Sequence, residues 1–108
     1  MAHSGLVAPR GLLLIENTDQ EWLGNLSVYT CGVAAQRIYE ALGVPDNLGV
    51  SQVGHATHCE FVADQQPELT AYIERFLLDG SADTNVRTTD GGYSFDEERW
   101  VDWSTPSL

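Results

Sequence analysis

Two short segments predicted as strands, separated by a segment with helical spacing, are the feature that most restricts how this chain can fold. The first is a continuous apolar run within residues 11–16, as in a strand that is buried on both faces of a parallel sheet. Residues 30–42 place apolar side chains three and four positions apart, with Thr30 as the expected N-cap and Gly43 as the expected stop. Val50 to Val53 is the second predicted strand. A helix between two strands predicts a parallel pair joined by a right-handed crossover.

The remaining chain adds one more predicted helix and an irregular tail. Residues 67–78 carry an apolar stripe and begin with Pro67, which suits the first position of a helix. We expect residues 22–29 to be irregular, and the chain from Ala82 onward to be extended or loop-like, with a turn at residues 88–92. The predicted class is therefore α/β, with two parallel strands, two main helices and an irregular C-terminal tail.

Two parallel strands alone leave both faces and both edges of a sheet in need of cover. We therefore expect residues 1–108 to form one partial domain whose missing part lies upstream. The first residues lack the basic region and apolar stretch of a signal peptide.

Charge excludes two classes of partner. The formal net charge is −11, and the five Lys and Arg residues cannot form the cationic surface that nucleic acid requires. An anionic membrane surface is disfavoured for the same reason. No apolar run approaches the roughly 20 residues needed to span a bilayer.

Acidic residues follow the first predicted strand, and histidines follow the second. Glu16 and Asp19 flank the end of the first strand, whereas His55 and His58 lie in the loop after the second. In α/β-hydrolases the acid and the histidine of the catalytic triad follow late strands in this order, after the serine. A histidine suits the role of base because its pKa lies near neutrality. No serine here stands in a Gly-x-Ser-x-Gly frame, so the nucleophile is expected outside these 108 residues.

Other interpretations of the same residues remain open at this point. Loop histidines and acids commonly serve only as hydrogen-bonding groups, and Trp22 could be a core residue. His55, His58, Cys59 and Glu60 include good metal-ligand types, but their spacing fits no standard zinc signature, so we expect neither a metal nor a cofactor. Cys31 and the cysteine at position 59 could form one disulfide, pair elsewhere, or remain free.

Short motifs occur along nearly the whole chain, at Gly5 to Leu13, Glu16 to Asp19, Trp22 to Gly24, Tyr29 to Gly32, Ala41 to Asp46, Ser51 to Gly54, His58 with Cys59, and Trp103 to Leu108. These motifs resemble the C-terminal part of the glucuronoyl esterases, carbohydrate esterase family 15, which have the α/β-hydrolase fold. They cover nearly the whole chain in the family's order.

The resemblance implies a role for several residues. His58 matches the catalytic histidine, and Trp22 matches a tryptophan that lines the sugar pocket. Cys31 and Cys59 match cysteines that pair with upstream partners. One motif departs from the family, which commonly has Gly-Gly-His-x-His-Cys where this chain has Gly54-His55-Ala-Thr-His58-Cys. The departure leaves His55 without an implied role.

The implied activity is that of a secreted serine-type carboxylic ester hydrolase, a 4-O-methyl-glucuronoyl methylesterase. Its substrate would be the ester that joins a glucuronic acid branch of xylan to a lignin alcohol. His58 would be the base, and the acid would lie upstream or be Asp19 or Glu16. The isolated chain is expected to be inactive. The alternative is a non-catalytic carbohydrate-binding or interaction domain that uses Trp22, Trp100 and Trp103 as stacking surfaces.

Overall fold

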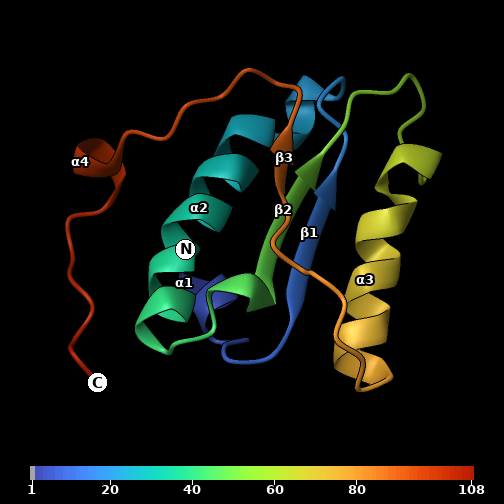
Figure 1. Ribbon diagram of the computed structural model, residues 1–108. Helices are drawn as coiled ribbons and strands as arrows, with labels where there is room; N and C mark the ends of the chain where they lie inside the picture. The colour runs from blue at the N-terminus through green and yellow to red at the C-terminus, as the bar shows by residue number, and fades with distance from the viewer. Residues whose placement is uncertain (1) are drawn as a thin grey trace.

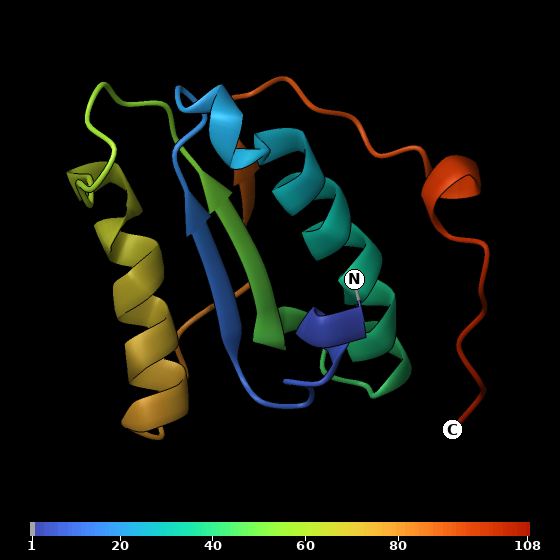
Figure 2. The same ribbon diagram turned by 180° about the vertical axis from the view of Figure 1, so that it is seen from behind.

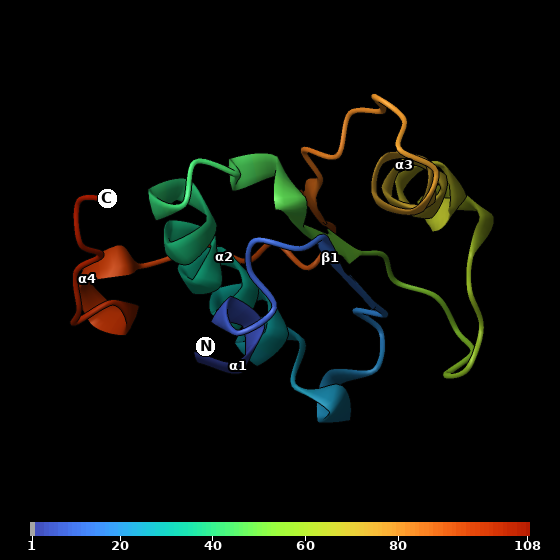
Figure 3. The same ribbon diagram turned by 90° about the horizontal axis from the view of Figure 1, so that it is seen from below.

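The computed structural model describes residues 2–108 as a parallel sheet with one long helix on each face. The strands are β1 (Leu12–Glu16), β2 (Leu48–Gln52) and β3 (Arg87–Thr89). Helix α2 (Asn25–Ala41) covers one face, and helix α3 (Gln66–Leu77) covers the other (Figures 1 and 3). This arrangement confirms the predicted α/β class, the parallel pairing of the first two strands and the second helix.

The three strands end side by side at one edge of the sheet. The strand order is β1-β2-β3, and both neighbouring pairs are parallel. Glu16 is in register with Gln52, which in turn is in register with Thr89, and the arrowheads lie together at the top of Figure 1. The loops that follow all three strands therefore start from the same edge.

The third strand was not expected. Arg87–Thr89 has three residues, of which the first two are exposed, so neither its length nor its burial gives the apolar signal of a buried strand. Its pairing with residues 50–52 makes it a strand. The prediction of two strands was therefore wrong, and the predicted turn at residues 88–92 begins only at Asp90.

Helix α2 starts five residues earlier than expected. A short 3-10 helix, η1 (Glu21–Leu23), precedes it, and Gly24 lies between them with a φ of 79° that favours glycine. Thr30 is buried inside the helix, so its assignment as N-cap was wrong. Tertiary bonds hold the first turn, since the Asn25 side chain donates to the carbonyl oxygen of Asn17 at 2.7 Å. A local capping pattern does not report such a contact.

Small residues let α2 lie close to the sheet. Ala34 and Ala35 are fully buried, and a Cβ added to Gly32 would lie 2.6 Å from Cγ2 of Val50. The core beside them includes Tyr39 and Leu48.

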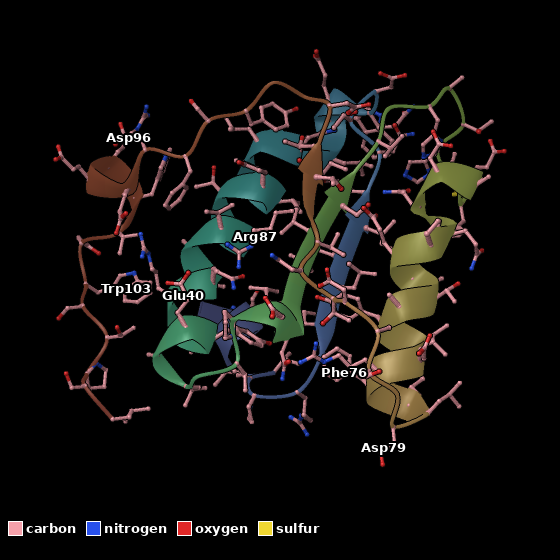
Figure 4. The ribbon with its side chains drawn as sticks, viewed as in Figure 1. Glu40, Phe76, Asp79, Arg87, Asp96 and Trp103 are labelled. Carbon is pink, nitrogen blue, oxygen red and sulfur yellow. The ribbon has the colours of Figure 1, made fainter. Side chains whose placement is uncertain are left out.

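Helix α3 packs against the opposite face through aromatic side chains. Tyr72 lies over Gly49, and its hydroxyl donates to the carbonyl oxygen of Thr84 at 3.2 Å. Burial is the main cause that raises the pKa of Tyr72. Phe76 extends from α3 towards the start of β1, where its ring leaves no room for a side chain at position 11 (Figure 4).

The remaining elements are short. They are α1 (Ala2–Gly5), η2 (Pro45–Asn47), η3 (Ala63–Gln65) and α4 (Glu97–Trp100). The C-terminal tail runs beside α2, and an ion pair between Arg37 and Glu97 joins the tail to that helix (Figure 2). Figure 4 shows Glu40 on α2 and Trp103 on the facing tail. Among the helices of residues 2–108, none has the length and apolar character needed to cross a bilayer.

Candidate functional site

Both histidines singled out by the sequence lie at the edge where the strands end. A shallow cavity of about 150 Å³ opens there, and its lining includes Glu16, His55, His58 and Glu60. In open α/β sheets, ligands bind outside the carboxyl ends of the strands, which is the position of this cavity. The fold therefore brings the loop after β1 and the loop after β2 to one site.

His58 is exposed and is held by few contacts. Its ring stacks on that of Trp22, with centroids 4.9 Å apart and planes inclined by 24°. Its Nδ1 lies 2.9 Å from Sγ of Cys59. Within residues 2–108, Nε2 of His58 has no hydrogen-bond partner, so that nitrogen is available to a group from outside.

Trp22 is a surface residue. It is 71% exposed, and its indole Nε1 donates to Oε1 of Gln20 at 3.2 Å. The alternative in which Trp22 is a core residue is therefore wrong. An exposed aromatic face beside an exposed histidine suits a ligand with one apolar face.

The two candidate acids are not bonded to His58. Glu16 lines the same cavity, but its carboxylate accepts a hydrogen bond from the side chain of Gln52 at 2.5 Å. Burial raises the pKa of Glu16, and the bond from Gln52 opposes that rise. Asp19 instead lies against the next loop, where a Cβ on Gly54 would stand 2.7 Å from its Oδ1. The structure thus brings Glu16 and His58 to one cavity and leaves Asp19 beside it.

Asn17 connects the two loops and was missed in the sequence. Its Oδ1 accepts the backbone N–H groups of Asp19 and His55, both at 3.0 Å. Its Nδ2 donates to the carbonyl oxygens of His55 at 2.7 Å and Thr57 at 3.2 Å. The only signal in the sequence was its position as the first residue after a predicted strand. The acids on either side of it are more typical catalytic residue types, so the prediction named them instead.

The same amide also lies close to the His55 ring. Nδ2 of Asn17 is 3.1 Å from Nδ1 of His55, while the two hydrogens of the amide face the carbonyl oxygens of His55 and Thr57. His55 also lines the cavity, so its ring lies at the site.

Asp90 is a second residue missed by the sequence, and it follows β3. Its carboxylate accepts the backbone N–H of Gly54 at 2.7 Å and the hydroxyl of Thr18. These two bonds, that from Gly54 first, lower the pKa of Asp90. Asp90 thereby links the loops after all three strands.

The cysteines and the metal-ligand types make no site of their own here. Cys31 is half-buried in α2, Cys59 is exposed, and both are free thiols in the structure. Across residues 2–108, no three His, Cys, Asp or Glu side chains come together in a way that could hold a metal ion.

Sequence comparison places residues 2–43 in the family model described as fungal glucuronyl esterase. A 4-O-methyl-glucuronoyl methylesterase of Phanerochaete carnosa is 45% identical over 108 residues, a match that covers 97% of this chain and 27% of the relative. An enzyme of the same name from Podospora anserina is 49% identical, with 97% and 22% covered.

Solved structures agree with the sequence matches. The glucuronoyl esterase catalytic domain from Hypocrea jecorina superposes with a TM-score of 0.87 at 42% identity, covering 97% of this chain and 28% of that one. A glucuronoyl esterase mutant from Sporotrichum thermophile, in complex with methyl 4-O-methyl-β-D-glucopyranuronate, gives a TM-score of 0.81 at 39% identity, with 91% and 26% covered. The chain thus spans about a quarter of the length of the proteins it matches. By sequence and by fold, the chain is similar to the C-terminal part of the α/β-hydrolase domain of glucuronoyl esterases.

Proposed function

We propose that this chain supplies the catalytic histidine, His58, to a glucuronoyl esterase whose serine lies on another segment. The observation that carries the proposal is the exposed His58 ring at the carboxyl edge of the sheet, stacked on Trp22 and with a free Nε2. A base in that position can reach a nucleophile that is brought to the same edge.

The proposed chemistry is acyl transfer. Nε2 of His58 takes the proton of the serine hydroxyl as the oxygen attacks the ester carbonyl, and the imidazolium returns that proton to the leaving alcohol. A water molecule, deprotonated by the same nitrogen, then attacks the acyl-enzyme and releases the uronic acid and the serine. Each proton taken by His58 is given back within one of the two half-reactions.

A carboxylate is also needed to orient the imidazole and stabilise its charged form. Glu16 is the better placed of the two acids expected from the sequence, because it shares the cavity with His58. Asp19 is directed towards Gly54. A carboxylate on the serine-bearing segment is the other source, as the family resemblance implies. In that case Nδ1 of His58 exchanges its contact with Cys59 for the incoming acid.

The proposed substrate is a methyl, benzyl or lignin ester of a 4-O-methyl-glucuronic acid branch on xylan. Support comes from the names of the relatives and from the methyl glucuronate bound in the Sporotrichum thermophile structure. The exposed Trp22 ring offers a platform for one face of the sugar. We further propose that Cys31 and Cys59 pair with cysteines of the serine-bearing segment, in an extracellular setting.

The test is a chimera in which this chain replaces the matching segment of the Hypocrea jecorina catalytic domain. We expect the chimera to hydrolyse methyl and benzyl esters of glucuronic acid, and the 108-residue chain alone to show no hydrolysis. In the chimera, His58→Ala should lower kcat on the order of 10⁶-fold, the loss seen when the histidine of a catalytic triad is removed.

His3→Ala is the matched control, because it removes an exposed histidine that lies outside the site. It should leave kcat unchanged. A chimera that folds and hydrolyses the esters equally well with His58→Ala would refute the proposed role of His58. Hydrolysis by the isolated chain would refute the need for a second segment.

A further inference from the structure

We propose that Asn17 is a positioning residue for His58, whose buried amide fixes the backbone of the loop that carries the histidine. The inference rests on the proposed function only for the role of His58. The hydrogen bonds themselves, and the order they impose on the loop, are properties of this chain.

The Asn17 amide makes hydrogen bonds to both backbone groups of His55. Oδ1 of Asn17 accepts the N–H of His55, and Nδ2 donates to the carbonyl oxygen of the same residue. A further bond reaches the carbonyl oxygen of Thr57, the residue directly before His58. The loop backbone is therefore held at His55 and at Thr57. His58 is the residue that follows directly.

The hydrogen bonds also determine the orientation of the amide. Two N–H groups face its oxygen, and two carbonyl oxygens face its nitrogen. Rotating the amide by 180° would place Oδ1 of Asn17 against the two carbonyl oxygens and lose all four bonds. The loop needs a planar group that carries both a donor and an acceptor at this distance from the backbone. Aspartate, serine and leucine do not provide such a group.

Asn17 is itself held firmly. Its side chain is buried, with a relative exposure of 4%, and its carbonyl oxygen accepts the side chain of Asn25, which is 2% exposed. Asn25 belongs to the first turn of α2. The hydrogen bonds of Asn17 therefore connect the loop that carries His58 to a long helix as well as to β1. By contrast, the direct contacts of His58 involve the exposed Trp22 and Cys59.

The position of His58 can be read without measuring any reaction. Because its ring stacks on Trp22, the ring current of the indole should shift the His58 ring protons upfield in the ¹H spectrum. In the 108-residue chain, we expect Asn17→Asp to reduce that shift by at least half at pH 7. Hydrogen exchange at the His55 amide should become about tenfold faster, since the neighbouring carbonyl oxygens then face a carboxylate.

Three further variants define the comparison. Asn17→Ala should give the same result as Asn17→Asp, while the amides of β2 stay protected in both. His55→Leu removes the imidazole ring but keeps the backbone bonds to Asn17, so the His58 shift should persist. Asn47→Ala removes a half-buried asparagine that lies outside the site and donates to the carbonyl oxygen of Pro9, and it should leave both signals unchanged.

Retention of the His58 shift and of His55 protection in Asn17→Asp would overturn the proposal. The proposal would also fall if β2 lost protection together with the loop in both Asn17 variants, because Asn17 would then support the whole fold. Neither result depends on ester hydrolysis. An inactive chimera would therefore refute the proposed function and leave the positioning role of Asn17 standing.

Discussion

Replacing Asp90 tests whether one carboxylate joins the loops that follow the three strands. Asp90→Ala removes the acceptor for the Gly54 N–H and for the Thr18 hydroxyl. A buried, charge-assisted hydrogen bond contributes about 1.5–3 kcal/mol, but Asp90 is exposed, and exposed charged contacts contribute about 0.2–1 kcal/mol. We therefore expect a loss of about 1 kcal/mol at pH 7, or a fall in Tm of roughly 4–8 °C for a domain of this size.

The pH dependence of this loss has a definite sign. The two bonds lower the pKa of Asp90 in the folded chain, so the unfolded chain takes up the proton first as the pH falls. The stabilisation is complete above the ordinary aspartate pKa of about 4. It disappears as the pH falls from there through the lower pKa of the folded state. The stability difference between the natural chain and Asp90→Ala should thus shrink towards pH 3.

Thermal unfolding followed by circular dichroism between pH 3 and 7 measures both effects. Asp102→Ala is the control, since Asp102 is exposed and its side chain makes no hydrogen bond or ion pair within residues 2–108. Asp90→Asn should give an intermediate loss, because one oxygen can still accept the Gly54 N–H. Equal Tm values for Asp90→Ala and Asp102→Ala at pH 7, or a difference that grows on acidification, would refute the reasoning.

Three other substitutions probe the packing and the second shifted carboxyl. Gly32→Ala should cost about 1 kcal/mol net, because overpacking against Val50 costs about 1–3 kcal/mol and the helical preference of alanine returns about 1 kcal/mol; urea unfolding should show the loss, and Val50→Ala should relieve it. Tyr72→Phe should cost about 1 kcal/mol in the same assay, since the carbonyl oxygen of Thr84 loses the bond from the Tyr72 hydroxyl and keeps only the Val86 N–H. An unchanged urea midpoint would contradict the bond. Burial raises the pKa of Glu16 in the folded chain. The natural chain should therefore lose stability relative to Glu16→Gln as the pH rises from about 4.3, the ordinary glutamate pKa, towards the raised value. A relative gain in stability over that range would contradict the pKa shift.

Much of the scaffold could be predicted because its signals are local. The apolar run at β1 and the amphipathic spacing of α3 each lie within a few consecutive residues, and both elements are found within two positions of the predicted bounds. The parallel pairing of β1 and β2 followed from the helix between them. Such features depend on periodicity, which a single sequence contains in full.

The unpredicted parts depend on contacts between distant residues. β3 owes its strand geometry to its pairing with β2, and its own residues carry little apolar signal. The start of α2 depends on Asn25, whose side chain bonds eight residues back along the chain to Asn17. Asn17 and Asp90 reach loops 38 and 36 residues away, so no local pattern could indicate their partners. Polar residues commonly follow strands, and only the folded structure shows which of them connect one loop to another.

The site contains two kinds of residue with different roles. His58 and Trp22, which carry the proposed chemistry, are exposed and contact each other. Asn17 and Gln52 are buried; Asn17 bonds the backbone of the loop after β2, and Gln52 bonds the end of β1 and the start of α2. Exposed side chains make few contacts that contribute to folding, so their replacement should alter function and leave the fold intact. The buried amides are constrained in the opposite way, because any loss leaves a backbone group without a partner. A sequence search that weights only chemically reactive residue types therefore finds the first kind and overlooks the second. Under the positioning role proposed for Asn17, the placement of the exposed His58 depends on a buried amide that takes no part in the reaction.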